Sequence, residues 1–384
     1  MSSTEKDGMF VVTPFVNATH DQTFRGSFGP ATSPPVRYFV ITDLLLIIKI
    51  IRAVSYAITT FGILSNICNI IVFVGLGVLE TATSLTLFAL SISDLSFLLI
   101  LLMYWTLLFL VNLGVTQTVE AVSVEDLAYQ FLFYFRMVYT LSELFTVYLA
   151  VQKCCCVALP FHFKLIFTPA KALATLFTMV IVVFACYAPL FFTTGLQEIV
   201  DMTQNTTRYI IWFSEDREII TNIFHNIVNL LVPTAGQVIV AVCLVVLTRK
   251  LRKTTKFRQA SEKFESKDDG SKVGESKVDE SKVKGSKVKD SSKLSGKELR
   301  AVQSVVVLVV MFIVCNLPTV LTQYVSYIEP EFNDFRWYGT IYALVGQLRM
   351  CLMVCCSSFN VFVYFTFNSS YRQQAIRRRR PTRM

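Results

Sequence analysis

Charged residues are scarce in this sequence of 384 residues: they account for 16% of it, whereas hydrophobic residues account for 53%. Soluble domains usually carry about a quarter charged residues, so the composition is typical of a membrane protein. The net charge of +9 does not indicate a nucleic-acid partner, because the basic residues gather beside apolar spans, in 249–300 and 372–383. Basic patches interleaved with aromatic residues, which nucleic-acid binding would favour, are absent from the sequence.

The cysteines and histidines do not form the patterns expected of a disulfide scaffold or a zinc site. All ten cysteines lie inside or at the ends of apolar spans, and none lies in a segment predicted to be extracellular, which argues against a disulfide scaffold. Cys154, Cys155 and Cys156 are contiguous and only three histidines exist, so the spacing of a zinc site is missing. The first thirty residues contain no apolar signal-peptide core, and we expect the first apolar span to direct membrane insertion.

Seven apolar stretches are long enough to cross a bilayer, and they predict an all-α membrane protein built as a seven-transmembrane helix bundle. The predicted spans are 53–79, 84–111, 131–160, 170–192, 219–247, 301–328 and 337–367. The predicted domains are an extracellular arm (1–47), a seven-helix domain (48–367) and a basic cytoplasmic tail (368–384). Within the second domain, 249–297 is predicted to be a disordered cytoplasmic loop, because Ser-Lys-Val recurs there every five residues and large apolar residues are few.

The distribution of positive charge predicts the orientation. The segment between the fifth and sixth spans holds 17 Lys and Arg residues and the tail holds 6, so most of the 36 basic residues lie on one side. By the positive-inside rule that side is cytoplasmic, which places the N-terminus outside and the C-terminus inside. The glycosylation sequons at Asn17 and Asn205 then face the exterior, whereas a third, at Asn368, faces the interior and cannot be used.

The third span carries charges that a lipid-facing helix would not tolerate. Arg136 and Glu143 are seven residues apart, which places them on one helix face about 10 Å apart along the axis, and Lys153 lies near the end. Such residues usually face the interior of a bundle or a water-filled cavity. This single helix therefore offers polar groups toward two compartments.

Four polar residues lie deep in four different apolar spans: Asn66, Asp94, Ser142 and Asn360. Each would cost several kcal/mol if it had no partner in lipid. They could satisfy one another around the Asp94 carboxylate, with water or a small cation such as sodium held by Asp94 and Ser142. The alternative is that each residue only joins neighbouring helices.

Short motifs on these spans resemble those of the rhodopsin-like G-protein-coupled receptors, over roughly residues 50–375. They are Gly62-Ile-Leu-Ser-Asn66, Leu90-Ser-Ile-Ser-Asp94-Leu, Cys315-Asn-Leu-Pro318 with Phe312 before it, Pro233, and Asn360-Val-Phe-Val-Tyr364. The resemblance implies a polar switch core made of Asn66, Asp94, Ser142, Phe312, Asn316, Pro318, Asn360 and Tyr364. Asn316 stands where the family usually has tryptophan.

The sequence departs from the family pattern at several positions. Gln152-Lys153-Cys154 replaces Asp-Arg-Tyr at the end of the third span, and Glu298 matches the acid that pairs with that arginine. These four residues are the expected G-protein contact region. The usual disulfide to the second outer loop has no cysteines here, and the fourth-span tryptophan is missing. The run at 294–303 and the Gln152-Lys153-Cys154 variant resemble divergent invertebrate receptors, such as the molluscan chemosensory type.

The ligand is expected between the outer halves of the helices, near six residues: Arg136, Tyr139, His225, Asn229, Gln323 and Arg349. Two arginines there suggest an anionic or carboxylate-bearing ligand, such as a small acid or a peptide terminus. The alternative is that they pair with Glu143, Asp126 or Glu331, or reach the surface.

The resemblance implies a plasma-membrane receptor that binds an extracellular ligand and activates a heterotrimeric G protein, with an arrestin and a kinase as further partners. The basic run 377–380 is expected to contact anionic lipid. A retinal photoreceptor is excluded, because 337–367 contains no lysine. Enzyme motifs are missing, so no enzymatic activity and no cofactor are predicted. A transporter or ion channel, with Asp94, Arg136 and Glu143 as an ion path, is the alternative.

Overall fold

The computed structural model describes residues 36–113, 124–201, 206–268, 296–333 and 336–379. Within these ranges, seven helical spans are long and apolar enough to cross a membrane, which confirms the predicted all-α seven-transmembrane bundle. The spans are Asp43–Leu76, Ala82–Leu110, Leu127–Ala158, Pro169–Phe192, Arg217–Lys250, Val305–Ile328 and Gly339–Phe367.

The described residues form helices and one two-stranded hairpin. In order they are α1 (Val36–Leu76), α2 (Ala82–Asn112), α3 (Val124–Ala158), α4 (Pro160–Ile166), α5 (Pro169–Phe192), β1 (Thr194–Asp201), β2 (Thr206–Phe213), α6 (Arg217–Phe224), the π-helix η1 (His225–Leu231), α7 (Val232–Asp268), α8 (Gly296–Ile328), α9 (Gly339–Ser358), α10 (Asn360–Phe367) and α11 (Ser369–Arg379).

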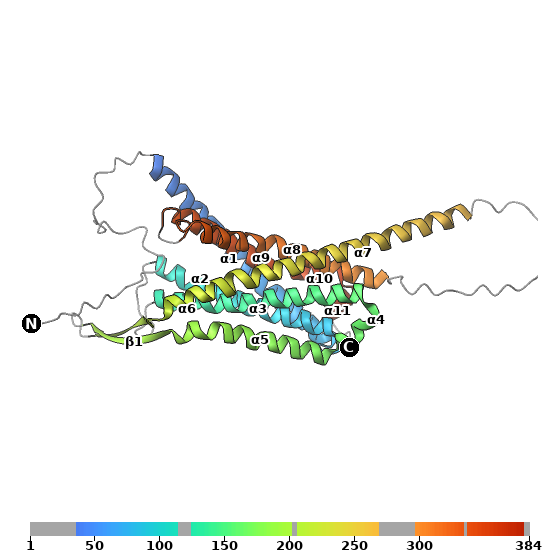
Figure 1. Cartoon of the computed structure of the whole chain (residues 1–384), viewed down its shortest axis with the longest axis horizontal. Helices are drawn as coiled ribbons and strands as arrows, with labels where there is room; N and C mark the ends of the chain where they lie inside the picture. The colour runs from blue at the N-terminus through green and yellow to red at the C-terminus, as the bar shows by residue number, and fades with distance from the viewer. Residues whose placement is uncertain (1–35, 114–123, 202–205, 269–295, 334–335, 380–384) are drawn as a thin grey trace, which may run out of the picture.

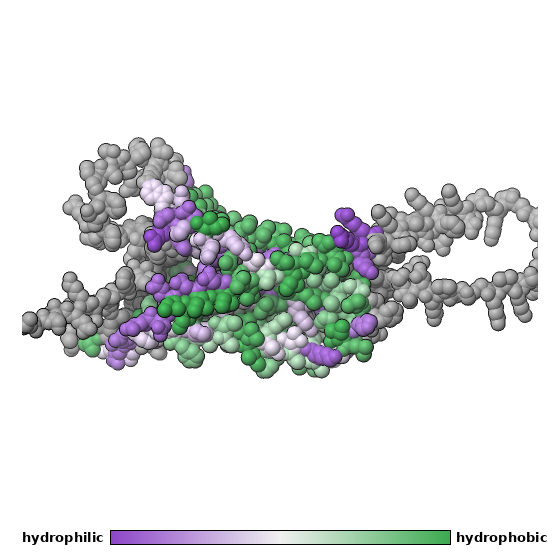
Figure 2. All heavy atoms as spheres, in the orientation of Figure 1, coloured by the Kyte–Doolittle hydropathy of each residue, from purple (hydrophilic) through white to green (hydrophobic). Residues whose placement is uncertain are grey.

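The long helices lie side by side along the long axis of the molecule (Figure 1). The β1–β2 hairpin marks one end of this bundle, here named the hairpin end, and α4 and α11 mark the opposite end, here named the α4 end. Hydrophobic residues form a broad belt around the middle of the face in Figure 2, with hydrophilic residues toward both ends. Many large apolar side chains of the long helices are exposed, including Phe184, Val242 and Leu321. They need no protein cover because lipid tails are as apolar as they are.

Two helices extend beyond the predicted spans. α1 begins at Val36, so the last part of the predicted arm, 36–47, is helical; an apolar run starting near Phe39 supports the extension. α7 continues to Asp268, so 249–268 is helical where a disordered loop was predicted. That stretch is rich in Lys, Arg, Gln and Glu, which are good helix formers, and has neither Gly nor Pro. Residues 269–295 lie outside the described ranges.

The segment 193–217, predicted to be a polar loop, contains an antiparallel hairpin that was not predicted from the sequence. Its register runs from the pair Thr194 and Phe213 to the pair Asp201 and Thr206. The β-branched and aromatic run at 209–213 was the available signal for a strand. The predicted link at 161–169 likewise contains the short helix α4, with Pro160 at its first position, where a missing N–H costs nothing.

Prolines lie in the fourth and fifth spans, whereas the seventh span is interrupted without one. Pro233 follows the π-helix η1, where the N–H of Val232 bonds to the carbonyl of Ile227, and a wide turn of this kind is a recognised feature inside transmembrane helices. Pro189 lies inside α5, which ends three residues later at Phe192. The predicted seventh span, whose family-like motif has lost its proline, is nonetheless interrupted at Phe359 between α9 and α10.

Candidate functional site

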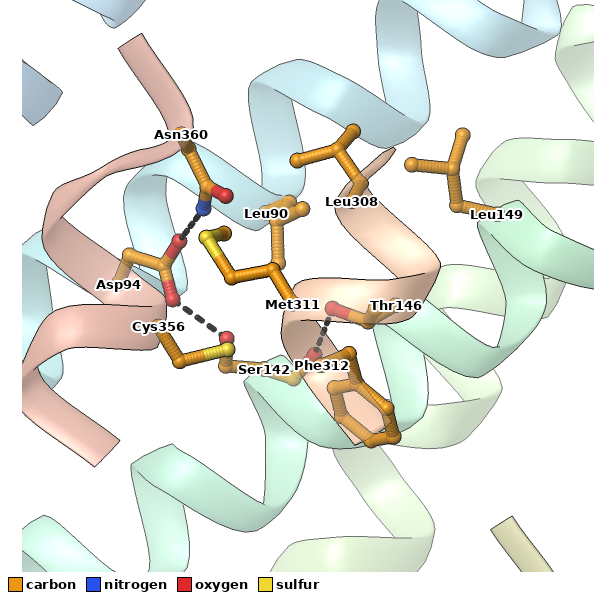
Figure 3. A pocket seen from close by; sticks show the side chains of 10 residues that line it. All are labelled: Leu90, Asp94, Ser142, Thr146, Leu149, Leu308, Met311, Phe312, Cys356 and Asn360. Atoms are coloured by element: carbon orange, nitrogen blue, oxygen red, sulfur yellow. Dashed lines mark hydrogen bonds between the residues drawn. The ribbon is translucent and has the colours of Figure 1, made fainter. Parts of the chain in front are cut away.

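The buried carboxylate of Asp94 joins three helices, α2, α3 and α10 (Figure 3). Its side chain is 1% exposed. The hydroxyl of Ser142 on α3 donates to Oδ1 at 2.5 Å, and the amide Nδ2 of Asn360 on α10 donates to Oδ2 at 2.8 Å. Both oxygens of the carboxylate therefore accept a hydrogen bond, as a buried carboxylate requires. Three of the four residues predicted to converge here are in direct contact.

A small cavity adjoins this carboxylate. The space that it offers to a water-sized sphere is about 10 Å³, roughly enough for one water molecule or one small ion. Its oxygen-bearing side chains belong to Asp94, Ser142, Thr146 and Asn360. The remaining lining is apolar or sulfur-bearing: Leu90, Leu149, Leu308, Met311, Phe312 and Cys356. The cavity thus connects the predicted polar core to Phe312 of the predicted switch.

Asn66 takes part in a different contact from the one predicted. Its Nδ2 donates to the backbone oxygen of Ser357 at 2.8 Å and to that of Gly62 at 3.0 Å. The neighbouring Ser65 hydroxyl donates to the backbone oxygen of Ser358 at 2.9 Å. These bonds join α1 to the last turn of α9, just before the interruption that positions Asn360. Asn66 therefore supports Asp94 through the backbone and not by direct contact.

The same network extends to the α4 end of the bundle. Asn69 donates to Oδ1 of Asn66 at 3.3 Å, and the hydroxyl of Tyr371 on α11 donates to Oδ1 of Asn69 at 2.7 Å. Burial raises the pKa of Tyr371 to about 12, so its hydroxyl stays protonated and remains a donor. Tyr364 packs beside it, with 5.7 Å between the ring centroids. The Tyr364 hydroxyl is buried and has no partner within the described ranges.

The predicted switch residue Asn316 is bonded to a predicted ligand residue. The hydroxyl of Tyr139 on α3 donates to Oδ1 of Asn316 on α8 at 2.6 Å, and both side chains are buried. Nδ2 of Asn316 donates to the backbone oxygen of Phe312 at 3.1 Å. Pro318, inside α8, accepts a bond of 2.6 Å from the hydroxyl of Thr322. Tyr139 therefore belongs to the switch region as much as to the expected ligand region.

Toward the hairpin end, two arginines lie within electrostatic range of His225. His225, on the π-helix, lies close enough to Arg136 of α3 and Arg349 of α9 to interact electrostatically with both. Arg136 also interacts with Glu143, one of its predicted alternative partners, and places Nη1 3.8 Å from the sulfur of Met353. The guanidinium of Arg349 lies 5.9 Å from the ring centroid of Tyr342. Of the six predicted ligand residues, these three are therefore linked by electrostatic interactions with His225.

The other predicted ligand residues differ in their surroundings. Nδ2 of Asn229 lies 3.5 Å from Nδ1 of His225, one helical turn earlier. Gln323 of α8 is 5% exposed, and its Oε1 has no hydrogen-bond partner among the residues that the structure describes. A buried amide oxygen without a donor is costly, so Gln323 is suited to accept a bond from a ligand or a water molecule.

The predicted G-protein contact region lies at the α4 end of α3. Nζ of Lys153 donates to the hydroxyl of Thr83 on α2 at 2.8 Å. Gln152 is fully buried, and neither atom of its amide has a partner in the described part of the chain. Cys154 packs into an apolar cluster with Cys243 of α7. Glu298 lies on α8, but its side chain is outside the described residues.

The two predicted glycosylation sites, Asn17 and Asn205, also lie outside the described residues.

Several contributors to these contacts gave no recognisable signal in the sequence. Thr83 and Tyr371 are isolated polar residues near helix ends, and Ser357 contributes its backbone oxygen to Asn66. The thiols of Cys315 and Cys356 lie within hydrogen-bonding reach of each other across α8 and α9. Only Cys315 had a motif to indicate it.

Comparison with known proteins agrees with this arrangement. No curated protein matches the chain. The family described as "7 transmembrane receptor (rhodopsin family)" matches residues 65–364, which include the Asp94 core, the Tyr139–Asn316 contact and the Arg136 cluster. The chain therefore belongs to the rhodopsin family of seven-transmembrane receptors.

Proposed function

We propose that this receptor binds a ligand with an anionic group near the hairpin end and activates a heterotrimeric G protein at the α4 end. The observation that carries the proposal is that Arg136 and Arg349, on two different helices, both lie within electrostatic range of His225 on a third. Arginine offers a planar fork that matches a carboxylate or phosphate, and binding across several helices lets a ligand change their relative positions. A ligand shifts the receptor only by its difference in affinity between two helix arrangements.

The orientation follows from the placement of positive charge. The α4 end carries Lys153, Lys171, and the basic segments at 249–268 and in α11. By the positive-inside rule this end faces the cytoplasm of a cell whose plasma membrane holds the receptor, and the hairpin faces the exterior. α7 extends beyond the other helices at this end (Figure 1). It therefore offers a surface to a G protein, an arrestin or a kinase, and α11 lies where it can contact anionic lipid.

The Asp94 cavity fits a small hard cation such as sodium. Its donors are the carboxylate of Asp94, the hydroxyls of Ser142 and Thr146, and the side-chain oxygen of Asn360, and hard cations prefer oxygen ligands. When bound, the cation would supply a positive charge beside Asp94 and would favour the helix arrangement that encloses it. Asp94 and Ser142 would be its principal ligands.

The family disfavours the transporter or ion-channel alternative, because its members are receptors. Arg136 has a second interpretation, however, because its electrostatic interaction with Glu143 also fits a purely structural role. The two interpretations differ in what Glu143 does. A structural pair loses stability when either partner is removed, whereas a ligand-binding arginine is made more available when Glu143 is neutralised.

The test uses cells that express the receptor with promiscuous G proteins. A panel of small carboxylic acids, organic phosphates and peptides with free or amidated C-termini is applied, and G-protein activation is recorded beside ion flux. We expect the active compound to carry an acid group, and its ester or amide to be about 100-fold weaker, as for loss of a charged bidentate bond. Arg136→Gln should remove the response at unchanged surface expression, and Glu143→Gln should preserve it. Equal losses of expression in both variants would support the structural pair instead.

A further inference from the structure

Arg217, the first residue of α6, has an environment that the ligand and switch contacts do not explain. Its side chain is only 9% exposed, although it directly follows an exposed turn. Nη1 donates to the backbone oxygen of Leu190 at 3.1 Å and to the hydroxyl of Thr193 at 3.2 Å. Nη2 lies 3.4 Å from the hydroxyl of Tyr129. One guanidinium thus bonds to the end of α5 and to α3.

The same guanidinium lies between two aromatic rings. Its central carbon is 4.7 Å from the ring centroid of Phe213, the last residue of β2, and 5.4 Å from that of Phe133 on α3. Tyr129 meets Phe213 edge to face, with 5.9 Å between the centroids. Arg217 therefore contacts the hairpin, α3 and α5 at once.

Only arginine can make this set of contacts. None of the five partners carries a charge, so the cation is stabilised by a carbonyl, two hydroxyls and two ring faces. A planar fork donates in several directions while its faces stack on aromatic rings; the ammonium of lysine is a point charge and cannot do both. The base of the hairpin is closed beside it, where the N–H of Ser214 bonds to the carbonyl of Thr193 at 3.1 Å.

No covalent bond performs this role. All ten cysteines lie in the described part of the chain and none forms a disulfide, and neither 124–135 nor 193–217 contains a cysteine. We propose that Arg217 is a noncovalent latch that holds the β1–β2 hairpin against the hairpin end of α3. The position of the hairpin is then independent of the redox state of its surroundings. This inference needs no ligand and goes beyond the proposed function.

Hydrogen–deuterium exchange of the purified full-length receptor in detergent tests the latch. We expect the amides of β1 and β2 to exchange about tenfold faster in Arg217→Ala and also in Arg217→Lys, while the amides of α2 keep their rates, because local opening exposes only the released segment. The wild-type hairpin should exchange at the same rate with and without a phosphine reductant. Arg336→Ala is the matched control: it removes an exposed arginine from the loop between α8 and α9, at the same end, and should change nothing.

Tyr129→Phe and Phe213→Leu each remove one partner and keep Arg217, so they extend the test if the arginine variants fold poorly. Each should give an intermediate acceleration limited to the hairpin. Wild-type exchange rates in both Arg217 variants would overturn the proposal. So would an equal acceleration across all helices, which indicates general destabilisation, or a hairpin that loosens when reductant is added.

Discussion

The hydroxyl of Tyr139 donates a hydrogen bond of 2.6 Å to the side chain of Asn316, and this bond joins α3 to α8 in the interior of the bundle. The residue at the Asn316 position is usually a tryptophan in receptors of this family, whose bulk packs against its neighbours. Here a directional bond takes the place of that bulk. Tyr139 lies on α3 between Arg136 and Ser142, which lines the Asp94 cavity, so the bond lies between the proposed ligand site and that cavity.

Breaking this bond should raise basal signalling. We expect Tyr139→Phe and Asn316→Leu each to increase ligand-independent G-protein activation about fivefold, because a buried hydrogen bond contributes about 1 kcal/mol and its loss releases α8. The double variant should match the single variants, since both remove one interaction. Tyr134→Phe, on the lipid-exposed side of α3, is the control and should behave as wild type. Additive effects in the double variant would contradict a shared bond.

Neutralising the central carboxylate should reduce activation. In Asp94→Asn the charge-assisted bonds from Ser142 and Asn360 are lost, and we expect about a tenfold lower maximal response with normal surface expression. We also expect the variant to respond equally in sodium and choline buffers, whereas the wild-type response should differ between them. Ser91→Ala serves as control, because within the described ranges its buried hydroxyl bonds only to the backbone of its own helix, at Leu87. A sodium effect that survives in Asp94→Asn would locate the cation elsewhere.

The close approach of α1 and α9 depends on Gly62. A Cβ atom at this position would lie 2.1 Å from the hydroxyl of Ser358 and 2.8 Å from Leu98, so Gly62→Ala forces the helices apart. We expect a loss of about 1 to 3 kcal/mol, measured as a lower thermal midpoint of the purified receptor. Gly346→Ala, in α9, is the matched control because its Cβ would meet nothing within 4 Å. That variant should be neutral or slightly stabilised.

Thr83 and Lys153 should have opposite effects on signalling. Thr83→Val removes the acceptor that holds Lys153 beside α2, and we expect basal activation to rise about fivefold as the lysine becomes available to a G protein. Lys153→Ala should lower activation instead. Thr86→Val is a suitable control, because the only partner of the Thr86 hydroxyl among the residues that the structure describes is the Ala82 carbonyl of its own helix. If both variants change signalling in the same direction, the contact is structural and not regulatory.

The proposed orientation predicts which sequons are used. Asn17→Gln and Asn205→Gln should each abolish one shift in electrophoretic mobility that peptide N-glycosidase removes from the wild type. Asn368→Gln should cause no change, because the start of α11 is assigned to the cytoplasm. Glycosylation at Asn368 would reverse the orientation.

Much of the bundle could be predicted because lipid imposes strong rules. Seven apolar stretches had to become helices, since backbone groups in a bilayer must bond within their own segment. The same rule made Asp94, Ser142 and Asn360 conspicuous, and the structure joins them. Asn66 was assigned to the same cluster, but it bonds to the backbone carbonyl of Ser357. This contact was not predicted, because a backbone acceptor exposed where the helix is interrupted at Phe359 leaves no trace in the sequence. Helix ends outside the apolar spans were predicted less well, as at Val36 and Asp268.

The sequence by itself determined that the chain crosses a membrane seven times and that polar residues must face inward, because the cost of an unpartnered polar group in lipid depends on composition alone. Only the tertiary structure decided which side chains meet. The Tyr139–Asn316 bond and the contacts of Arg217 join helices distant along the chain, and the distances between their atoms depend on helix packing that no local pattern records.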